Sequence, residues 1–259
     1  TANPTYYFPG LIDEVKIYDY ARSPAQIAWD FNKGKPVGHW KLDEGSGTNA
    51  YDSSPHGNNG TLINMEAEDW VDGRYGKALD FDGGTSLEYV DLPHSASLNI
   101  TTPITLTAWI NPRACGGGST WGKEIISRGT GGDPENSMWL TVRNDCKIHF
   151  GYEYGSGTNV ETNSDTTVQT DAWNFVVGEW DGSDLKVSVN GGAFEGVSSA
   201  PNSPGSFGNQ FRIGYRYLGS GFGEYFDGYI DDARIYNYAR TIEQIRQDYN
   251  AGAAAHFGE

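Results

Sequence analysis

The sequence predicts an all-β protein built from two packed antiparallel sheets. The chain has 259 residues with 35 Gly, 11 Pro, 16 Tyr, 11 Phe and 8 Trp, whereas hydrophobic residues make up only 37%. This composition is typical of many short strands joined by turns around an aromatic core. Short β-forming runs alternate with clusters of Gly, Asn, Asp and Pro, and no helical pattern separates them. Strands connected in this way pair as antiparallel neighbours and pack as two sheets.

The individual strands are expected where apolar and β-branched residues recur between turn signals. Turns are expected at residues 144–145, 181–182 and 190–191, because Asn, Asp and Gly tolerate a positive φ. The expected strands are residues 37–42, 78–81, 87–92, 104–110, 124–128, 137–143, 147–152, 173–180, 185–189, 210–215 and 225–237.

The charge balance excludes two classes of partner. The chain carries 34 acidic and 18 basic residues, which gives a net charge of −16. Nucleic acids and anionic membranes both attract clustered Lys and Arg, and the basic residues here are scattered singly. No run of apolar residues is long enough for a membrane-spanning helix. We therefore expect neither nucleic-acid binding nor membrane insertion.

An internal repeat predicts the domain organisation. Residues 7–34 align with residues 225–252 at a constant offset of 218, and 15 of the 28 aligned residues are identical. We therefore expect residues 1–36 to be the C-terminal strand and helix of a preceding repeat. Residues 37–252 are expected to form one full domain, and residues 253–259 a tail or the start of a further repeat.

Each copy of the repeat is expected to form a strand, a turn and a short helix. Thr241 is followed by Gln244, and Ser23 by Gln26, at the spacing of a capping box. Pro24 suits the first helical position, where its missing N–H has no helical partner to lose. Apolar residues four apart would lay one face of each helix on the sandwich, so these helices are expected to serve packing.

The two cysteines, Cys115 and Cys146, are too few for a disulfide framework and are not spaced as zinc ligands. If residues 124–128, 137–143 and 147–152 form a meander, the loop that holds Cys115 lies at the same end as the turn that holds Cys146. A disulfide is then geometrically possible, and it would suit an oxidising compartment. Two unpaired thiols are the alternative.

Five segments together resemble a known family. They are GHWKLDEGSGTNAYDSSPHGNNGTL, GKALDFDGGTSLEYVDLP, ITLTAWINP, WNFVVGEWDGSDLKVSVNG and FDGYIDDARIYNYARTIEQI, in this order. They look like the successive motifs of bacterial laminin-G-like domains of the concanavalin A-like lectin/glucanase superfamily. The resemblance implies a jelly-roll sandwich, a role in sugar or protein binding and adhesion on larger secreted or surface proteins, and frequently a structural calcium ion.

Calcium is the cofactor that the acidic residues favour, because Ca²⁺ takes six to eight oxygen ligands. Asp231 and Asp232 are adjacent within an apolar strand, where an unpaired carboxylate facing the core is costly. A bulge that turns both residues outward is the alternative. In the related domains these motifs help to form a calcium site, so the resemblance implies Asp82 and Asp231 as ligands, with Asp232 as a further candidate.

Glycan binding would rest on aromatic side chains that stack on sugar rings, with polar groups beside them. Trp121, between Gly-rich stretches, is the best candidate for an exposed platform, and Tyr152, Tyr154 and Tyr217 are further candidates. For any one aromatic residue of a β-sandwich, a place in the core or in a cross-strand pair is the simpler interpretation.

A catalytic constellation is not visible in the sequence. The segment 179–181, Glu-Trp-Asp, approaches the paired-carboxylate pattern of glycosidases, but a Gly-Ser-Asp turn follows where the second Glu should be. We therefore expect a non-catalytic, calcium-stabilised extracellular or cell-surface module of a multi-repeat protein that binds a glycan or a surface protein. A structural repeat that assembles head to tail, with residues 1–34 donating a strand to a neighbouring copy, is the alternative. Packing of residues 1–34 on their own domain is the other possibility for this segment, and a glycoside hydrolase is the least favoured interpretation.

Overall fold

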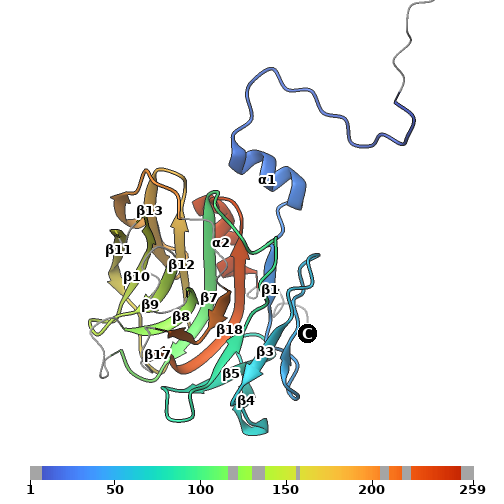
Figure 1. The fold of residues 1–259 in the computed structure, drawn as a ribbon. Helices are drawn as coiled ribbons and strands as arrows, with labels where there is room; N and C mark the ends of the chain where they lie inside the picture. The colour runs from blue at the N-terminus through green and yellow to red at the C-terminus, as the bar shows by residue number, and fades with distance from the viewer. Residues whose placement is uncertain are drawn as a thin grey trace, which may run out of the picture.

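The computed structural model describes residues 8–115, 122–129, 138–155, 158–204, 210–217 and 223–251. Two eight-stranded antiparallel sheets face each other in a sandwich, and a two-stranded hairpin accompanies them (Figure 1). The expected all-β jelly-roll class is therefore confirmed. Residues 253–259, expected to be a tail or a further repeat, lie outside the described residues.

The first sheet has β18 at its centre, between β7 on one side and β5 and β1 on the other. In spatial order its strands are β14 (Glu195–Ser199), β13 (Asp184–Val189), β12 (Asn174–Trp180), β7 (Ile104–Pro112), β18 (Asp227–Tyr236), β5 (Lys77–Asp82) and β4 (Trp70–Asp72), and β1 (Gly38–Trp40) also pairs with β18.

The second sheet contains the meander that the sequence predicts, because β8 pairs with β9 and β9 with β10. In spatial order its strands are β11 (Thr158–Thr167), β10 (Lys147–Tyr154), β9 (Met138–Val142), β8 (Lys123–Arg128), β15 (Phe211–Ile213), β6 (Tyr89–Asp91), β3 (Gly60–Ile63) and β2 (Asn49–Ala50). The separate hairpin consists of β16 (Tyr215–Tyr217) and β17 (Gly223–Tyr225), and a short 3₁₀ helix, η1, covers Ala67–Asp69.

The core lies between the two sheets and is closely packed. Gly178 on β12 shows this, because a Cβ placed there would come within 2.5 Å of the Phe150 ring and 3.0 Å of Leu140 on the opposite sheet. A side chain at this position would push the sheets apart. Trp40 and Trp180 are buried in the same core.

The meander brings the two cysteines together. Cys115, just after β7, is joined to Cys146, just before β10, with an S–S distance of 2.03 Å and a Cα–Cα distance of 4.9 Å. The described residues contain no free cysteine. The bond therefore ties the β7–β8 connection to the β9–β10 turn.

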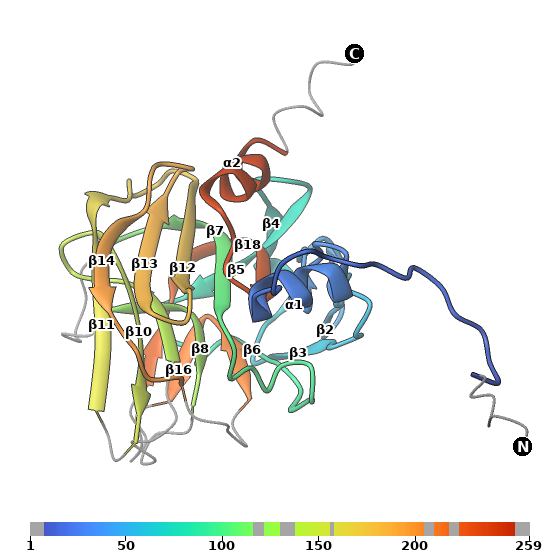
Figure 2. The same ribbon diagram turned by 90° about the horizontal axis from the view of Figure 1, so that it is seen from above.

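The C-terminal helix α2 (Ile242–Asn250) packs on the outer face of the first sheet (Figure 2). Ile245 is buried against Trp109 and Phe175, and the Tyr249 ring stacks on Trp109 with centroids 5.5 Å apart. Thr241 and Gln244 form the expected capping box. The helix closes over an aromatic patch that β7 and β12 would otherwise expose.

The N-terminal copy of the repeat differs from its prediction. Its helix α1 (Pro24–Asn32) forms with the expected capping box of Ser23 and Gln26. Residues 8–22, however, form no strand; they extend away from the sandwich (Figures 1 and 2). The reason is physical, since a β-strand needs a neighbouring strand for its backbone hydrogen bonds, and none pairs with this segment in the described part of the chain.

Candidate functional site

A bulge in β18 turns Asp231 and Asp232 toward a pocket that Asp43 also lines. The register with β7 shifts between Asp231 and Arg234, and Asp232 has a left-handed φ of 50°. Two adjacent residues can therefore face the same side of the sheet. Asp43, Asp231 and Asp232, together with Tyr75, line a cavity of about 280 Å³.

Asp231 is the fully buried member of this pocket. Its Oδ2 accepts a hydrogen bond from the Tyr75 backbone N–H at 2.9 Å, whereas its buried Oδ1 has no hydrogen-bond partner in the described residues. Burial raises the pKa of Asp231 to about 7, and the nearby charges of Asp232 and Asp43 also act in this direction. The site therefore holds an oxygen that needs a proton or a cation.

Asp232, in contrast, is already neutralised. Its Oδ1 lies 2.5 Å from His39 Nε2, and its Oδ2 accepts from Arg234 Nη2 at 2.5 Å. Although burial opposes ionisation, the His39 hydrogen bond and the Arg234 charge together lower the pKa of this carboxyl. Asp232 is thus a structural ion-pair partner, and both of its carboxylate oxygens already contact His39 or Arg234.

Asp82 does not share a site with Asp231. Across the β5–β18 pair Asp82 is opposite Asp227, four residues from Asp231 and so roughly 13 Å away along the strand. Its carboxylate caps the following loop, accepting from the backbone N–H of Gly84 at 2.9 Å and of Ser86 at 2.5 Å. The expectation that these two aspartates act together is therefore corrected by the strand register.

A calcium ion finds only part of a coordination shell in this structure. The described ranges contain no group of three or more His, Cys, Asp or Glu side chains placed to hold a metal. Asp231 Oδ1, which lacks a hydrogen bond, fits a hard cation, and Asp43 lines the same cavity. Asp82 and Asp232 do not fit, since their oxygens already accept hydrogen bonds.

A second candidate site lies where β6 of the second sheet meets the separate β16–β17 hairpin, and three tyrosine rings pack in a row there. The Tyr215 ring lies between Tyr89 and Tyr225, with centroid distances of 4.9 and 4.5 Å. Arg212 lies within 6 Å of two of the rings and donates through Nε to Asp91 Oδ1 at 3.1 Å. We call these five residues the tyrosine surface. Tyr89, Tyr225, Arg212 and Asp91 are all half-buried, so parts of the two rings and of the two charged side chains are accessible to solvent.

A buried charge cluster lies beside the tyrosine surface. Arg216 stacks on Trp139, with 4.4 Å between the guanidinium carbon and the ring centre, and approaches the Glu124 carboxylate at 3.7 Å. Glu224 and His149 are also buried here. Burial raises the pKa of Glu124 well above its usual value and lowers that of His149 to about 4. Because Arg216 covers Trp139, this ring is not an open platform.

The structure describes three of the four aromatic residues predicted for glycan binding, and these three do not form one exposed surface. Trp121 lies outside the described residues. Tyr152 is fully buried, where its ring packs against Trp180 and its hydroxyl donates to the Asn202 carbonyl. The prediction of Tyr152 as a glycan-binding residue is therefore corrected, because side chains alternate between the two faces of β10 and the Tyr152 ring is on the face toward the core. Tyr154 and Tyr217 are half-buried at strand ends.

Tyr89 and Tyr225 of the tyrosine surface are not predicted from the sequence, although a signal for Tyr89 exists. Residues 87–92 were recognised as a strand, and buried Val90 alternates with half-buried Tyr89 and Asp91. The alternation indicates that both polar or aromatic residues face away from the core. What no local pattern reveals is that Tyr215, more than 120 residues later, packs against Tyr89 and that Tyr225 stacks on Tyr215.

The carboxylate that came nearest to a glycosidase pattern has a structural role. Glu179 on β12 is buried and accepts hydrogen bonds from the Arg240 backbone N–H at 2.8 Å and from the Thr105 hydroxyl at 3.2 Å. Burial raises its pKa to about 8. This side chain fastens the chain before α2 to the first sheet and faces no open cleft.

The two facing sheets and their connectivity define a concanavalin A-like jelly-roll domain. The chain belongs to the concanavalin A-like lectin/glucanases superfamily, because the laminin-G model of that superfamily matches residues 82–246, more than half of the chain. The expected laminin-G-like membership is thereby confirmed. A search of curated proteins gave no match. Neither helix in the described ranges has the length and apolar character needed to cross a bilayer.

Solved structures show the same fold at low sequence identity. Domain 4 of the extracellular arabinanase AbnA of Geobacillus stearothermophilus, solved with arabinotriose, matches with a TM-score of 0.65 and 20% identity over 83% of this chain and 98% of that domain. The binding domain of Paraclostridial Mosquitocidal Protein 1 matches with a TM-score of 0.64 and 13% identity, over 85% and 53% of the two chains.

A structure of botulinum neurotoxin type C, whose cell entry depends on two ganglioside molecules, has a TM-score of 0.62 and 12% identity. The match covers 86% of this chain and 52% of the toxin chain. This chain thus spans about half of each toxin binding domain and nearly all of the arabinanase domain.

Proposed function

We propose that this domain is a non-catalytic glycan-binding module of an extracellular, multi-repeat protein, and that the tyrosine surface is its binding site. The half-buried rings of Tyr89 and Tyr225, which pack on either side of the buried Tyr215 ring, carry this proposal. Tyrosine offers an apolar face to sugar C–H groups, and Arg212 and Asp91 supply a donor and an acceptor for hydroxyls. Burial raises the pKa of Tyr89, so its hydroxyl stays neutral.

The comparisons support glycan binding in general, since the arabinanase domain was solved with arabinotriose and the toxin depends on gangliosides. The net charge of −16 favours an uncharged glycan over a polyanionic one. The disulfide between Cys115 and Cys146 is consistent with an oxidising, extracellular compartment. A role in adhesion would follow from display of such modules on a surface protein.

Calcium would stabilise the fold from the pocket beside β18. Asp231 and Asp43 would hold the ion, which would offset the charge that Asp231 carries when ionised. The pocket lies on the first sheet, whereas the tyrosine surface lies on the second sheet and the β16–β17 hairpin. The ion would therefore act on stability and would not touch the bound sugar.

Arabinotriose is the first probe for a binding experiment by titration calorimetry. Tyr89→Ala and Tyr225→Ala should each weaken binding by about tenfold, which corresponds to ~1.4 kcal/mol of lost contact. Tyr51→Ala is the matched control, because Tyr51 is an exposed tyrosine that follows the edge strand β2, two strands away from β6.

A panel of uncharged oligosaccharides extends the same test if arabinotriose does not bind. Equal weakening by Tyr51→Ala and Tyr89→Ala, or no binding to any member of the panel, would contradict the proposed site. Release of reducing sugar from a bound oligosaccharide would contradict the non-catalytic assignment.

A further inference from the structure

The N-terminal copy of the repeat exposes the side chains that the C-terminal copy buries. Each residue of the tail, residues 8–34, has a counterpart 218 positions later. Phe8, Ile12, Ile17 and Ile27 are 68%, 65%, 94% and 57% exposed, whereas Phe226, Ile230, Ile235 and Ile245 are all at 0%. The tail therefore carries the same apolar face as β18 and α2 without a sheet to cover it.

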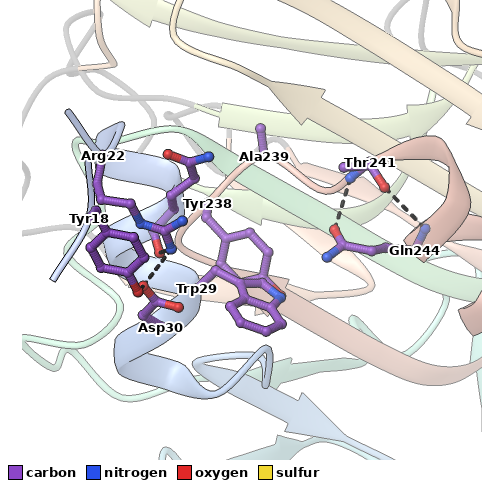
Figure 3. A pocket seen from close by; sticks show the side chains of 9 residues that line it. Tyr18, Arg22, Trp29, Asp30, Tyr238, Ala239, Thr241 and Gln244 are labelled. Carbon is purple, nitrogen blue, oxygen red and sulfur yellow. Dashed lines mark hydrogen bonds and ion pairs between the residues drawn. The ribbon is translucent and has the colours of Figure 1, made fainter. Parts of the chain in front are cut away.

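The polar part of the tail is already arranged as in the domain. Arg22 donates to Asp30, and Tyr18 donates to Asp30 at 3.1 Å (Figure 3). Arg22 also donates to the Tyr20 hydroxyl. We call these four residues the clasp. The counterparts Tyr236, Tyr238, Arg240 and Asp248 make the same contacts, with 3.2 Å for the Tyr236 to Asp248 bond. The clasp forms without the surrounding jelly roll.

The geometry of β18 determines what can accept the tail. In the domain this strand is hydrogen-bonded on both edges, to β7 on one side and to β5 and β1 on the other. The tail segment equivalent to β18 therefore needs a gap between two strands, because a single sheet edge would pair the backbone groups on only one of its sides. An intact second copy of this chain offers no such gap, because its own β18 fills it.

We propose that residues 8–34 are the last strand and helix of a second jelly-roll unit of this same fold, one that lacks its own final strand and helix. Insertion would bury Phe8, Ile12 and Ile17 between the sheets of that unit and Ile27 on its outer face. The inference rests on the repeat and the fold and is independent of glycan binding.

The docked unit would lie beside the C-terminal end of this domain. The base of α1 is bound there, because Asn32 Nδ2 donates to Asn237 Oδ1 at 2.5 Å and the Tyr238 hydroxyl donates to the Gly34 carbonyl at 2.9 Å. A cavity of about 440 Å³ separates the clasp from its counterpart, with Trp29 and Gln244 in its walls (Figure 3). Two consecutive units would thus meet through their clasps.

A tandem protein tests this proposal. In this protein residue 225 of an added segment, residues 37–225, is joined directly to residue 8, and the chain then continues from residue 8 to its end. The tail thereby supplies the final strand and helix of the added unit. Hydrogen exchange of the amides at residues 11–17 should slow at least ~100-fold relative to the unextended chain, because they enter a sheet. Calorimetry should show about twice the unfolding enthalpy of the unextended chain.

Two matched substitutions distinguish docking from unspecific collapse. Ile12→Asp, at the position of buried Ile230, should abolish the slowed exchange, whereas Leu11→Asp, at the position of half-exposed Tyr229, should retain it. A reference tandem in which residues 226–252 follow residue 225 shows how the added unit behaves with its native strand.

Unchanged exchange at residues 11–17, with protease digestion of the added unit alone, would overturn the proposal. Self-association of the unextended chain that Ile12→Asp abolishes would also overturn it, since a second copy would then be the partner. Failure of glycan binding in either protein would leave this result unaffected.

Discussion

Glu14 and Asp232 hold the same left-handed backbone conformation, with φ of 47° and 50°, although only Asp232 lies in a sheet. They occupy equivalent positions of the repeat, 218 residues apart. Because Glu14 keeps this conformation without strand partners, the conformation is set by the local sequence. In both copies an Ile-Asp pair precedes the residue, and a basic residue lies two positions after it. The sheet then uses this preformed bend to direct Asp231 and Asp232 into one pocket.

The same equivalence predicts opposite responses to one substitution. Ile230→Asp should lower the free energy of unfolding by more than ~4 kcal/mol, because it buries an unpaired carboxylate in the core. Ile12→Asp should change it by less than ~0.5 kcal/mol, since Ile12 is 65% exposed. Urea denaturation of both variants measures the difference. A large loss of stability in Ile12→Asp would show that the tail packs on its own domain.

Features that depend on neighbouring residues in the sequence are predicted well for this fold, whereas features that depend on pairing between distant segments are not. Local signals succeeded: both capping boxes form, and β8, β9 and β10 make the expected meander. The resemblance that pointed to Asp82 and Asp231 did not reveal their spacing, because the register of β5 against β18 is a property of the folded sheet. The Tyr89 and Tyr215 stack depends likewise on pairing between distant segments.

Removing the charge of Asp232 should destabilise the domain. Asp232→Asn weakens the contacts with His39 and Arg234 and leaves a buried cation without its nearest carboxylate, which costs about 3 kcal/mol at neutral pH. The pKa of Asp232 is lowered in the fold, so its contribution is present above about pH 4 and is lost as the pH falls further. The cost of the substitution should shrink accordingly in acid.

Asp72→Asn is the control for that experiment. Asp72 also pairs with a cation, Lys77, at 2.8 Å, but its side chain is 95% exposed. Its replacement should change stability by less than ~0.5 kcal/mol. Equal effects of the two substitutions in thermal unfolding would contradict the structural role given to Asp232.

The pH dependence of stability should report on Asp231. Its pKa of about 7 lies above its usual value of 3.8, so the folded state holds the extra proton. Its contribution to stability is therefore complete below about pH 4 and is lost as the pH rises through about 7. Glu88 and Glu179, with pKa values of about 7 and about 8, act in the same direction. Asp231→Asn should flatten this decline in part.

Calcium should reverse the decline at Asp231, because the metal binds the ionised carboxylate. Addition of Ca²⁺ should raise the Tm at about pH 8 more than at about pH 6, and Asp231→Asn should remove the difference. Asp82→Asn serves as the control, since the Asp82 oxygens cap a loop. An equal calcium response in wild type and Asp231→Asn would place the ion elsewhere or exclude it.

The disulfide should be a large single contribution to stability. The bond closes a loop between two cysteines that are 31 residues apart. In the chain-entropy model this contributes about 3–4 kcal/mol to the free energy of unfolding, because the bond restricts the unfolded chain. The double substitution Cys115→Ser with Cys146→Ser should therefore lower the Tm by several degrees in a chain of this size. Calorimetry of wild type with and without reductant provides the same comparison, and an unchanged Tm in reductant would contradict the prediction.

Glu124 should tolerate neutralisation although it is fully buried. Burial raises its pKa well above the usual value, and neither of its oxygens has a hydrogen-bond partner in the described residues. Glu124→Gln preserves the shape and removes the charge that burial disfavours, so stability should change by less than ~1 kcal/mol. Arg216→Ala should cost about 1–3 kcal/mol, because it removes the guanidinium that stacks on Trp139 and faces Glu124. If Glu124→Gln proved the more damaging of the two in chemical denaturation, Glu124 would be ionised in the fold, and the cluster would be held by charge instead of by packing.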